Sequence, residues 1–366
     1  MILKELDIIN FKNIASSKLT FSPSFNCFVG KNGSGKTNVL DAIYHLGLCK
    51  SYFSLTDAQV IKHGEPFYML QASYEGQDDH LNIYCAYKRG EKKIFKKNNK
   101  AYTRLSEHIG LLPLVMISPN DFILVDGPSE ERRKFLDSIV SQFDSTYLYH
   151  LISYNKILTQ RNVLLKQMLN SPDSYMLEVL NEQLARAGNY IKTEREKFLT
   201  EFVVLFQNYY TKLSLDREIV SLEYVPSVKS GDMLVELNRV LSRDKILTYT
   251  SVGVHRDELS LKLDGHLIKK IGSQGQKKTF LVALKLAQYE VLSRRSVNKP
   301  ALLLDDVFDK LDADRVAQIM SLVRGDDFGQ VFITDTNRHN IVELLQNIID
   351  DFALFIVDNG EVVKQE

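Results

Sequence analysis

The sequence predicts an α/β protein with three parts: a mixed sheet with helices, an antiparallel side sheet and an inserted helical lobe. Three observations support this fold class. A glycine-rich loop joins a strand-like segment to a helix-like one near the N-terminus, residues 129–213 have helical periodicity, and strand-like segments return after residue 219. We expect a mainly helical lobe at 129–245, between the segments 1–128 and 246–366.

The composition is that of an ordinary folded chain. Of 366 residues, 44% are hydrophobic and 25% are charged, close to the averages for globular proteins. Lys plus Arg and Asp plus Glu each number 46, so a polyanionic partner would need a local basic patch. Three cysteines without a CxxC pair favour a reducing cytoplasm. No apolar run is long enough for a signal peptide or a membrane span, so we expect no membrane partner.

The predicted elements follow in chain order. Short strands are expected between residues 1 and 28, a helix at 38–48, and an antiparallel meander at 67–102 with a turn near Gly90. Gly127-Pro128 and the cap candidate Ser129 begin the helical lobe, and Ser171-Pro172-Asp173 divides it into two halves of about 40 residues each. Later elements are strands at 219–225, 259–263, 301–304, 330–334 and 352–357, with a helix at 277–292 and another before the last strand.

The glycine-rich loop fits the pattern G-x-x-x-x-G-K-[ST]. Its residues are Gly30, Lys31, Asn32, Gly33, Ser34, Gly35, Lys36 and Thr37. A loop that follows a strand and opens a helix can surround phosphates with backbone N–H groups, because the glycines lack the Cβ that would block the approach. Lys36 would reach the terminal phosphates of a bound nucleotide and act in catalysis, and the Thr37 hydroxyl would coordinate Mg²⁺.

Two carboxylates end the predicted strand at 301–304. Acidic groups at the carboxyl end of a strand face the ligand crevice of an open α/β sheet. Asp305 would hold Mg²⁺ through water, and Asp306 would orient or deprotonate the attacking water. A strand followed by Asp-Asp is by itself more often a turn, and the glycine-rich loop is what favours the catalytic interpretation.

A second candidate phosphate cradle lies at 271–278. Ser273 and Gly275 open the helix that continues through 292, and would supply a hydroxyl, a close backbone approach and the positive end of a helix dipole. Ser and Gly are also plain N-cap residues, which is the structural alternative.

Together these motifs resemble the ATP-binding-cassette ATPases, and within them the branch that contains SMC, Rad50 and RecF. The similarity to the RecF family runs through nearly the whole chain. It rests on Gly30 to Thr37, Gly272 to Gln276, and Leu302 to Asp306 with Leu311-Asp312, and further on 9–13, 118–122, 127–137 and 253–258. The second cradle corresponds to the signature motif of these ATPases, and it begins Gly272-Ser273 where Leu-Ser or Ala-Ser is usual. The strand at 330–334 leads to Thr334-Asp335-Thr336, without the histidine that is common in transporter ATPases.

The resemblance implies an ATPase head formed by 1–128 and 246–366, and a slow Mg²⁺-dependent ATPase. ATP would be sandwiched between two chains, with the glycine-rich loop (the P-loop) of one chain facing Ser273 of the other. A homodimer would therefore form with ATP. It further implies a protein of DNA repair, DNA replication and the SOS response that acts on gapped or double-stranded DNA and helps to load recombination mediators such as RecR. For the residue that senses the nucleotide, Asn120, Gln142 and Gln160 stay open, and the family pattern favours the segment 118–121.

A basic segment is the candidate DNA contact. Residues 87–104 hold eight basic side chains and the single acid Glu91. Lys92, Lys93, Lys96 and Lys97 are the proposed phosphate contacts, for binding without sequence preference. The alternative is a solvated hairpin tip. Arg256 is a second candidate cation, although an ion pair among Arg256, Asp257 and Glu258 explains it equally well, and His255 favours a structural role.

Three other functions are alternatives, and the sequence argues against the first two. A transporter ATPase subunit would place its signature sooner after the P-loop than residue 272. A long-armed protein of the SMC or Rad50 kind would need a longer coiled coil than the helical lobe can supply. A nucleotide switch with negligible turnover has the same motifs as a slow ATPase.

Overall fold

A computed structural model describes residues 1–76, 79–167, 174–214, 218–229, 231–307, 313–325, 327–348 and 351–365. The chain forms two compact units, one of residues 1–121 with 288–366 and the other of residues 122–287. Ser171-Pro172-Asp173 and Leu311-Asp312 lie outside the described residues. In the part that is described, no helix is both long and apolar enough to cross a membrane.

The second unit is larger than the helical lobe predicted at 129–245. Its boundaries fall at 121/122 and 287/288, where the sequence predicted 128/129 and 245/246. The reason is strand pairing: β9 (Val220–Val225) pairs antiparallel with β10 (Glu258–Leu263). That ladder joins the segment after 245 to the helical region.

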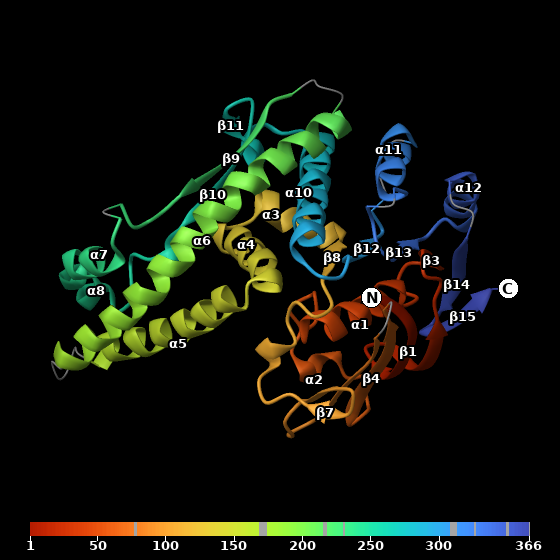
Figure 1. The fold of residues 1–366 in the computed structure, drawn as a ribbon, viewed down its shortest axis with the longest axis horizontal. Helices are drawn as coiled ribbons and strands as arrows, with labels where there is room; N and C mark the ends of the chain where they lie inside the picture. Colours follow the sequence, from red (N-terminus) through yellow and green to blue (C-terminus); the bar gives the residue numbers. More distant parts are fainter. Residues whose placement is uncertain are drawn as a thin grey trace. The chain divides into compact units, whose positions relative to one another are not determined.

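The first unit contains a six-stranded mixed sheet (Figure 1). Its order is β15 (Glu361–Gln365), β14 (Phe352–Asp358), β3 (Phe25–Val29), β13 (Val331–Asp335), β12 (Ala301–Asp305) and β8 (Leu114–Ile117). All neighbours are parallel except β14 and β15. The carboxyl ends of β3, β12 and β13 therefore meet at one edge, where ligands bind in open α/β sheets.

An antiparallel sheet in the same unit confirms the predicted meander. Its order is β2 (Ile14–Thr20), β1 (Ile2–Phe11), β4 (Phe67–Glu75), β5 (His80–Lys88), β6 (Ile94–Lys97) and β7 (Lys100–Ala101). In β4, buried residues alternate with more exposed ones, as one buried face requires. The first helix, α1 (Lys36–Leu48), packs against strands of both sheets, so its buried residues join them in one hydrophobic core.

Shorter helices complete the first unit. They are α2 (Asp57–Val60), η1 (Leu105–Glu107), η2 (Pro119–Asp121), α11 (Ala313–Val323) and α12 (Arg338–Ile348). The predicted strands and the helix beginning near residue 38 are confirmed within a few residues. The sequence did not predict the separation of β1 from β2 at Lys12-Asn13.

The second unit is mainly helical, with the three-stranded sheet β11-β10-β9. Its helices are α3 (Phe122–Asp126), α4 (Ser129–Phe143), α5 (Ser145–Gln167), α6 (Ser174–Ser214), α7 (Met233–Arg239), α8 (Leu241–Leu247), η3 (Val254–Arg256) and α9 (Ile268–Ile271), and β11 spans His266–Leu267. Helix α10 (Gln274–Arg295) begins in this unit and ends in the first. Helices α5 and α6 lie side by side (Figure 1).

The first half of the predicted helical pair is two helices rather than one. Asp144 has extended backbone angles, and its carboxylate accepts a hydrogen bond from the Tyr147 N–H at 2.9 Å. That side chain caps the start of α5, so the chain turns between α4 and α5. The described part of the second half is the single helix α6 of 41 residues, about 60 Å long.

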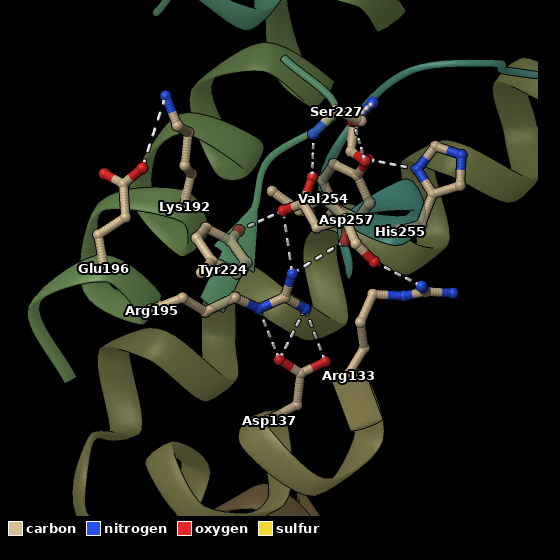
Figure 2. A network of polar contacts seen from close by, with 12 residues as sticks. Arg133, Asp137, Lys192, Arg195, Glu196, Tyr224, Ser227, Val254, His255 and Asp257 are labelled. Carbon is tan, nitrogen blue, oxygen red and sulfur yellow. Dashed lines mark hydrogen bonds and ion pairs between the residues drawn. The ribbon is translucent and has the colours of Figure 1, made fainter. Parts of the chain in front are cut away.

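The buried Arg195 lies at the centre of a polar network in the second unit (Figure 2). Arg195 on α6 pairs with Asp137 of α4 at 2.8 Å and with Asp257 at 3.3 Å. Glu258 pairs instead with Arg132 at 2.9 Å. The acids next to Arg256 therefore pair with arginines on other helices, and among the described residues neither acid forms the alternative ion pair with Arg256.

Arg256 and His255 have separate roles in the same segment. The Arg256 guanidinium lies 5.0 Å from the centre of the Tyr249 ring. Both ring nitrogens of His255 form hydrogen bonds: Nδ1 lies 2.7 Å from the Tyr154 hydroxyl, and Nε2 lies 3.1 Å from the Thr250 carbonyl oxygen. Burial lowers the pKa of His255 to about 4, which fits the structural role expected for it.

A fully buried ion pair gives the first prediction. Arg161 on α5 and Asp244 on α8 are both without exposed side-chain surface and lie 2.8 Å apart. Arg161→Met leaves the Asp244 carboxylate buried without its cation, which typically costs about 3–5 kcal/mol. Urea unfolding should show a loss of that size in the free energy of unfolding. Lys134→Ala, at an exposed pair, should lose at most about 1 kcal/mol, and equal losses would contradict the prediction.

Candidate functional site

The glycine-rich loop is held by close contacts that only glycine permits at two positions. A Cβ on Gly30 would lie 2.1 Å from the Val357 carbonyl oxygen of β14. A Cβ on Gly35, whose φ is +118°, would lie 2.7 Å from the Asn13 side-chain oxygen. The Ser34 carbonyl accepts hydrogen bonds from the Asn13 amide at 3.0 Å and the Gly360 N–H at 2.7 Å. The loop is therefore pressed between the β1–β2 turn and the β14–β15 turn.

Lys36 lies inside this loop. Its side chain is buried, and its ammonium donates to the carbonyl oxygens of Gly30 at 2.9 Å and Lys31 at 3.2 Å. The ammonium therefore bridges two carbonyl groups of the loop itself. An ammonium has three donors that can rotate, so Lys36 can exchange these carbonyl bonds for bonds to phosphate oxygens.

The structure brings Thr37 and Asp305 together, as the sequence predicted for a magnesium site. The Thr37 hydroxyl donates to Asp305 Oδ1 at 2.7 Å, and the Thr334 hydroxyl donates to the same oxygen at 2.9 Å. Asp306 follows in a left-handed conformation with φ +45°, and its backbone N–H donates to the Thr334 hydroxyl at 2.9 Å. Thr334 is therefore bonded to both residues, to Asp305 through its side chain and to Asp306 through its backbone N–H.

The carboxylates at this edge lie in an environment that disfavours negative charge. Burial raises the pKa of Asp305, although hydrogen bonds from Thr37 and Thr334 offset part of the rise. Burial also raises the pKa of Asp335 at the end of β13, and the nearby Asp306 carboxylate adds to the rise. A bound divalent cation would relieve this cost.

The residues fit a magnesium nucleotide. Ser34 Oγ is buried and has no hydrogen-bond partner among the described residues, and a phosphate oxygen would supply one. In the described part of the chain no group of three or more His, Cys, Asp or Glu could hold a metal by itself. Magnesium usually binds through one or two protein oxygens together with phosphates and water, so Thr37 and Asp305 suit Mg²⁺ that arrives with ATP.

A basic cavity that the sequence did not reveal adjoins the loop at Gly33. Its volume is about 800 Å³, and its lining includes Lys12, Asn13, Lys62 and Arg89. Lys12 is held by Asp41 of α1 at 2.8 Å, and Lys62 donates to the Asn13 carbonyl at 3.0 Å. The segment 9–13 was noted in the sequence only as a family motif, because nothing local indicates that its turn reaches the loop.

In the second unit, Ser273 is an exposed N-cap. Its hydroxyl accepts from the Gln276 N–H at 3.2 Å, and the Gln276 side-chain oxygen accepts from the Ser273 N–H at 2.6 Å. This reciprocal pair is a capping box. The structural role considered for Ser273 is thus present, and it leaves Ser273 and Gly275 in the first turn of α10 where the sequence placed them.

The four candidate DNA-contact lysines differ in their surroundings. Lys93 donates to the Cys49 carbonyl at 2.7 Å and pairs with Asp57 at 2.8 Å, with 10% of its side chain exposed. Lys93 therefore holds the side sheet to the α1–α2 region and lies apart from the exposed basic surface. Lys96 lies over the Tyr84 ring, and Lys92 and Lys97 are exposed.

The candidate sensing residues fall in both units. Asn120 is exposed in η2, just after β8, which pairs with β12. Gln142 is buried on α4, where its amide donates to the Ser138 carbonyl at 3.2 Å, and Gln160 is exposed on α5. Asn120 alone shares a unit with Asp305.

Comparison with known proteins places this geometry in a family. Residues 2–354 match the family described as RecF/RecN/SMC N terminal domain. The DNA replication and repair protein RecF of Parabacteroides distasonis is 49% identical over 366 residues, which cover 100% of both chains. That of Bacteroides thetaiotaomicron is 48% identical, covering 99% of this chain and 98% of the relative.

Solved structures show the same fold. A structure described as the recombination mediator protein RecF-ATP in the RecFOR pathway has a TM-score of 0.90 and 29% identity, and the match covers 100% of this chain and 98% of that one. An Smc head domain from Pyrococcus furiosus has a TM-score of 0.58 at 16% identity and shows the fold alone. The predicted fold class is confirmed.

The burial of Asp305 gives the second prediction. Its pKa is raised in the folded state, so the ionised carboxylate destabilises the fold at neutral pH, and this cost vanishes below the ordinary pKa of 3.8. Asp305→Asn keeps a side-chain oxygen for Thr37 and Thr334. Its Tm should exceed that of wild type by about 1–4 °C at pH 7, and the difference should shrink as the pH falls toward 4. An exposed control, Asp79→Asn, should not change Tm, and a lower Tm for Asp305→Asn at pH 7 would contradict this account.

Proposed function

This chain belongs to the RecF family, and from that membership we propose that it is an ATP-dependent DNA-binding protein of recombinational repair and replication restart. Its relatives are DNA replication and repair proteins, and the related solved structure is a recombination mediator described with ATP. The observation that carries the proposal is the hydrogen bond from Thr37 to Asp305, which assembles the predicted P-loop and acidic strand into one site.

Each residue of the site has a proposed role. Lys36 exchanges its bonds to Gly30 and Lys31 for bonds to the terminal phosphates. Thr37 and Asp305 hold Mg²⁺, which when bound neutralises charge on the phosphate oxygens. Asp306 accepts the proton of the attacking water. The rest of the loop, Lys31 to Gly35, supplies backbone N–H groups, and Asn13 and Lys62 in the adjoining cavity hold the remainder of the nucleotide.

The chain is proposed to complete this site by dimerising. Ser273 is exposed and stands with Gly275 at the first turn of a 22-residue helix, where the dipole favours anions. In a dimer the first turn of one copy would face the γ-phosphate held by the P-loop of the other. We expect slow hydrolysis, because two chains must associate before the site is complete.

DNA and protein partners follow from the family. We propose that Lys92, Lys96 and Lys97 contact the phosphates of gapped or double-stranded DNA and that RecR-like recombination mediators are the protein partners. Cys27, Cys49 and Cys85 are free and buried, which supports the proposed cytoplasmic location. Among the described residues, no observation favours a transporter subunit or a switch without turnover over this function.

Dimerisation gives the third prediction. Ser273→Arg places a bulky cation where the partner's phosphate would dock. The variant should bind ATP as wild type does but remain monomeric with ATP, as measured by nucleotide titration and light scattering. Lys36→Ala is the contrasting variant, because it should lose ATP binding itself.

The two variants separate the two parts of the proposal. A Ser273→Arg chain that dimerises normally with ATP would refute the sandwich while leaving nucleotide binding intact. A folded Lys36→Ala chain with unchanged affinity for ATP would refute the assignment of the P-loop.

The basic surface gives the fourth prediction. Changing Lys92, Lys96 and Lys97 to Ala should flatten the slope of log affinity for duplex DNA against log salt concentration by up to about 2–3 units, because each phosphate contact contributes about 0.9. Lys134 and Lys197 are exposed and paired with glutamates on helices, and changing both to Ala serves as the control. An unchanged slope in the triple variant would remove these lysines from the DNA interface.

A further inference from the structure

We propose that Glu218 is a positioning residue for the signature serine, acting through Gln276. The inference rests on the proposed function, because the reaction it supports is the docking of Ser273 on the partner's nucleotide. Glu218 lies just before β9, more than fifty residues from the signature in sequence, and neither the sequence nor the family comparison assigns it a role.

A chain of hydrogen bonds joins Glu218 to Ser273. One Glu218 oxygen accepts from the Gln276 side-chain amide nitrogen at 2.7 Å. The oxygen of the same amide accepts from the Ser273 N–H at 2.6 Å. Because an amide has a donor side and an acceptor side, the bond to Glu218 fixes which side faces Ser273.

The other Glu218 oxygen is fixed by a buried tyrosine. It accepts the hydroxyl of Tyr210, a residue of α6 with no exposed surface. The Tyr210 ring packs 5.9 Å from that of Phe280 on α10, and Phe206 packs 4.6 Å from the same ring. Glu218 is thus anchored to the helix pair that it braces.

This arrangement leaves specific donors for a phosphate. The Gln276 N–H and the Ser273 N–H are both used within the capping box. The Ser273 hydroxyl accepts in that box, so its own hydrogen can point outward, and the N–H groups of Gln274 and Gly275 belong to the helix turn that has no intrahelical acceptor. If the Gln276 amide turned over, its NH₂ would face the Ser273 N–H and the box would open.

Charge and geometry predict opposite effects of removing Glu218. A carboxylate near a phosphate site repels the anion, so loss of charge alone would strengthen the ATP-dependent dimer. Loss of the brace would weaken it. The direction of the change therefore distinguishes a positioning role from a bystander.

Two variants at the same position test the proposal. Glu218→Ala removes charge and brace together. Glu218→Gln removes the charge but keeps the brace. Its amide oxygen can accept from the Gln276 amide nitrogen while its NH₂ group donates to the Tyr210 hydroxyl oxygen. With ATP and Mg²⁺, we expect the dimer dissociation constant of Glu218→Ala to rise about tenfold, as for loss of a hydrogen bond to a charged group. Glu218→Gln should match wild type or bind more tightly.

Hydrogen exchange gives a readout that does not depend on dimerisation. In the full chain without nucleotide, residues 272–276 should exchange faster in Glu218→Ala than in wild type or Glu218→Gln. Tyr210→Phe keeps the bond between Glu218 and Gln276 but removes the anchor of the other Glu218 oxygen, so it should fall between wild type and Glu218→Ala in both measurements. Circular dichroism and ATP affinity serve as checks that each variant is folded.

The outcomes separate this inference from the proposed function. A Glu218→Ala chain that dimerises as well as or better than wild type, or that shows unchanged exchange at 272–276, would overturn the role of Glu218 even when Ser273→Arg blocks the dimer. A Ser273→Arg chain that still dimerises would instead refute the proposed function, whatever the exchange rates show.

Discussion

The hydrogen bond from Thr37 to Asp305 is the interaction on which the rest of the site depends. It joins residues 268 positions apart in the chain, and parallel pairing of β3 with β13 and of β13 with β12 brings them together. Because both segments leave the same edge of one sheet, the P-loop hydroxyl and the acidic strand meet without any rearrangement. The mixed sheet therefore sets the geometry of the site.

Buried charge is treated differently in the two units. In the first, Asp305 and Asp335 are buried where their pKa values rise, and this cost suits a cation that binds with the nucleotide. In the second, buried Arg161 and Arg195 each meet a carboxylate directly. The first arrangement suits the proposed cation binding, whereas the second holds helices in register, because an arginine that pairs with acids on other elements fixes their relative positions.

Local motifs explain how much of the molecule could be predicted. The P-loop, the Asp305 strand and the start of α10 are each encoded by a few adjacent residues. The structure shows these elements at the positions that the sequence predicted. The β1–β2 turn at Lys12-Asn13, the paired Lys93 and the brace at Glu218 depend on partners 21 to 58 residues away, so no local pattern could reveal them. The second unit was underestimated for the same reason, because the β9–β10 ladder joins distant segments.

The tight seat of the P-loop has an evolutionary consequence. Gly30 and Gly35 face the Val357 backbone oxygen of β14 and the Asn13 side chain at distances that exclude even a methyl group, so the smallest substitution at either position has to be matched by a shift in β14 or in the β1–β2 turn. A single substitution at either glycine is therefore disfavoured unless a neighbouring segment changes with it. Within this lineage, the loop and the two turns that flank it are expected to change together, whereas an exposed helix residue such as Lys134 can vary independently.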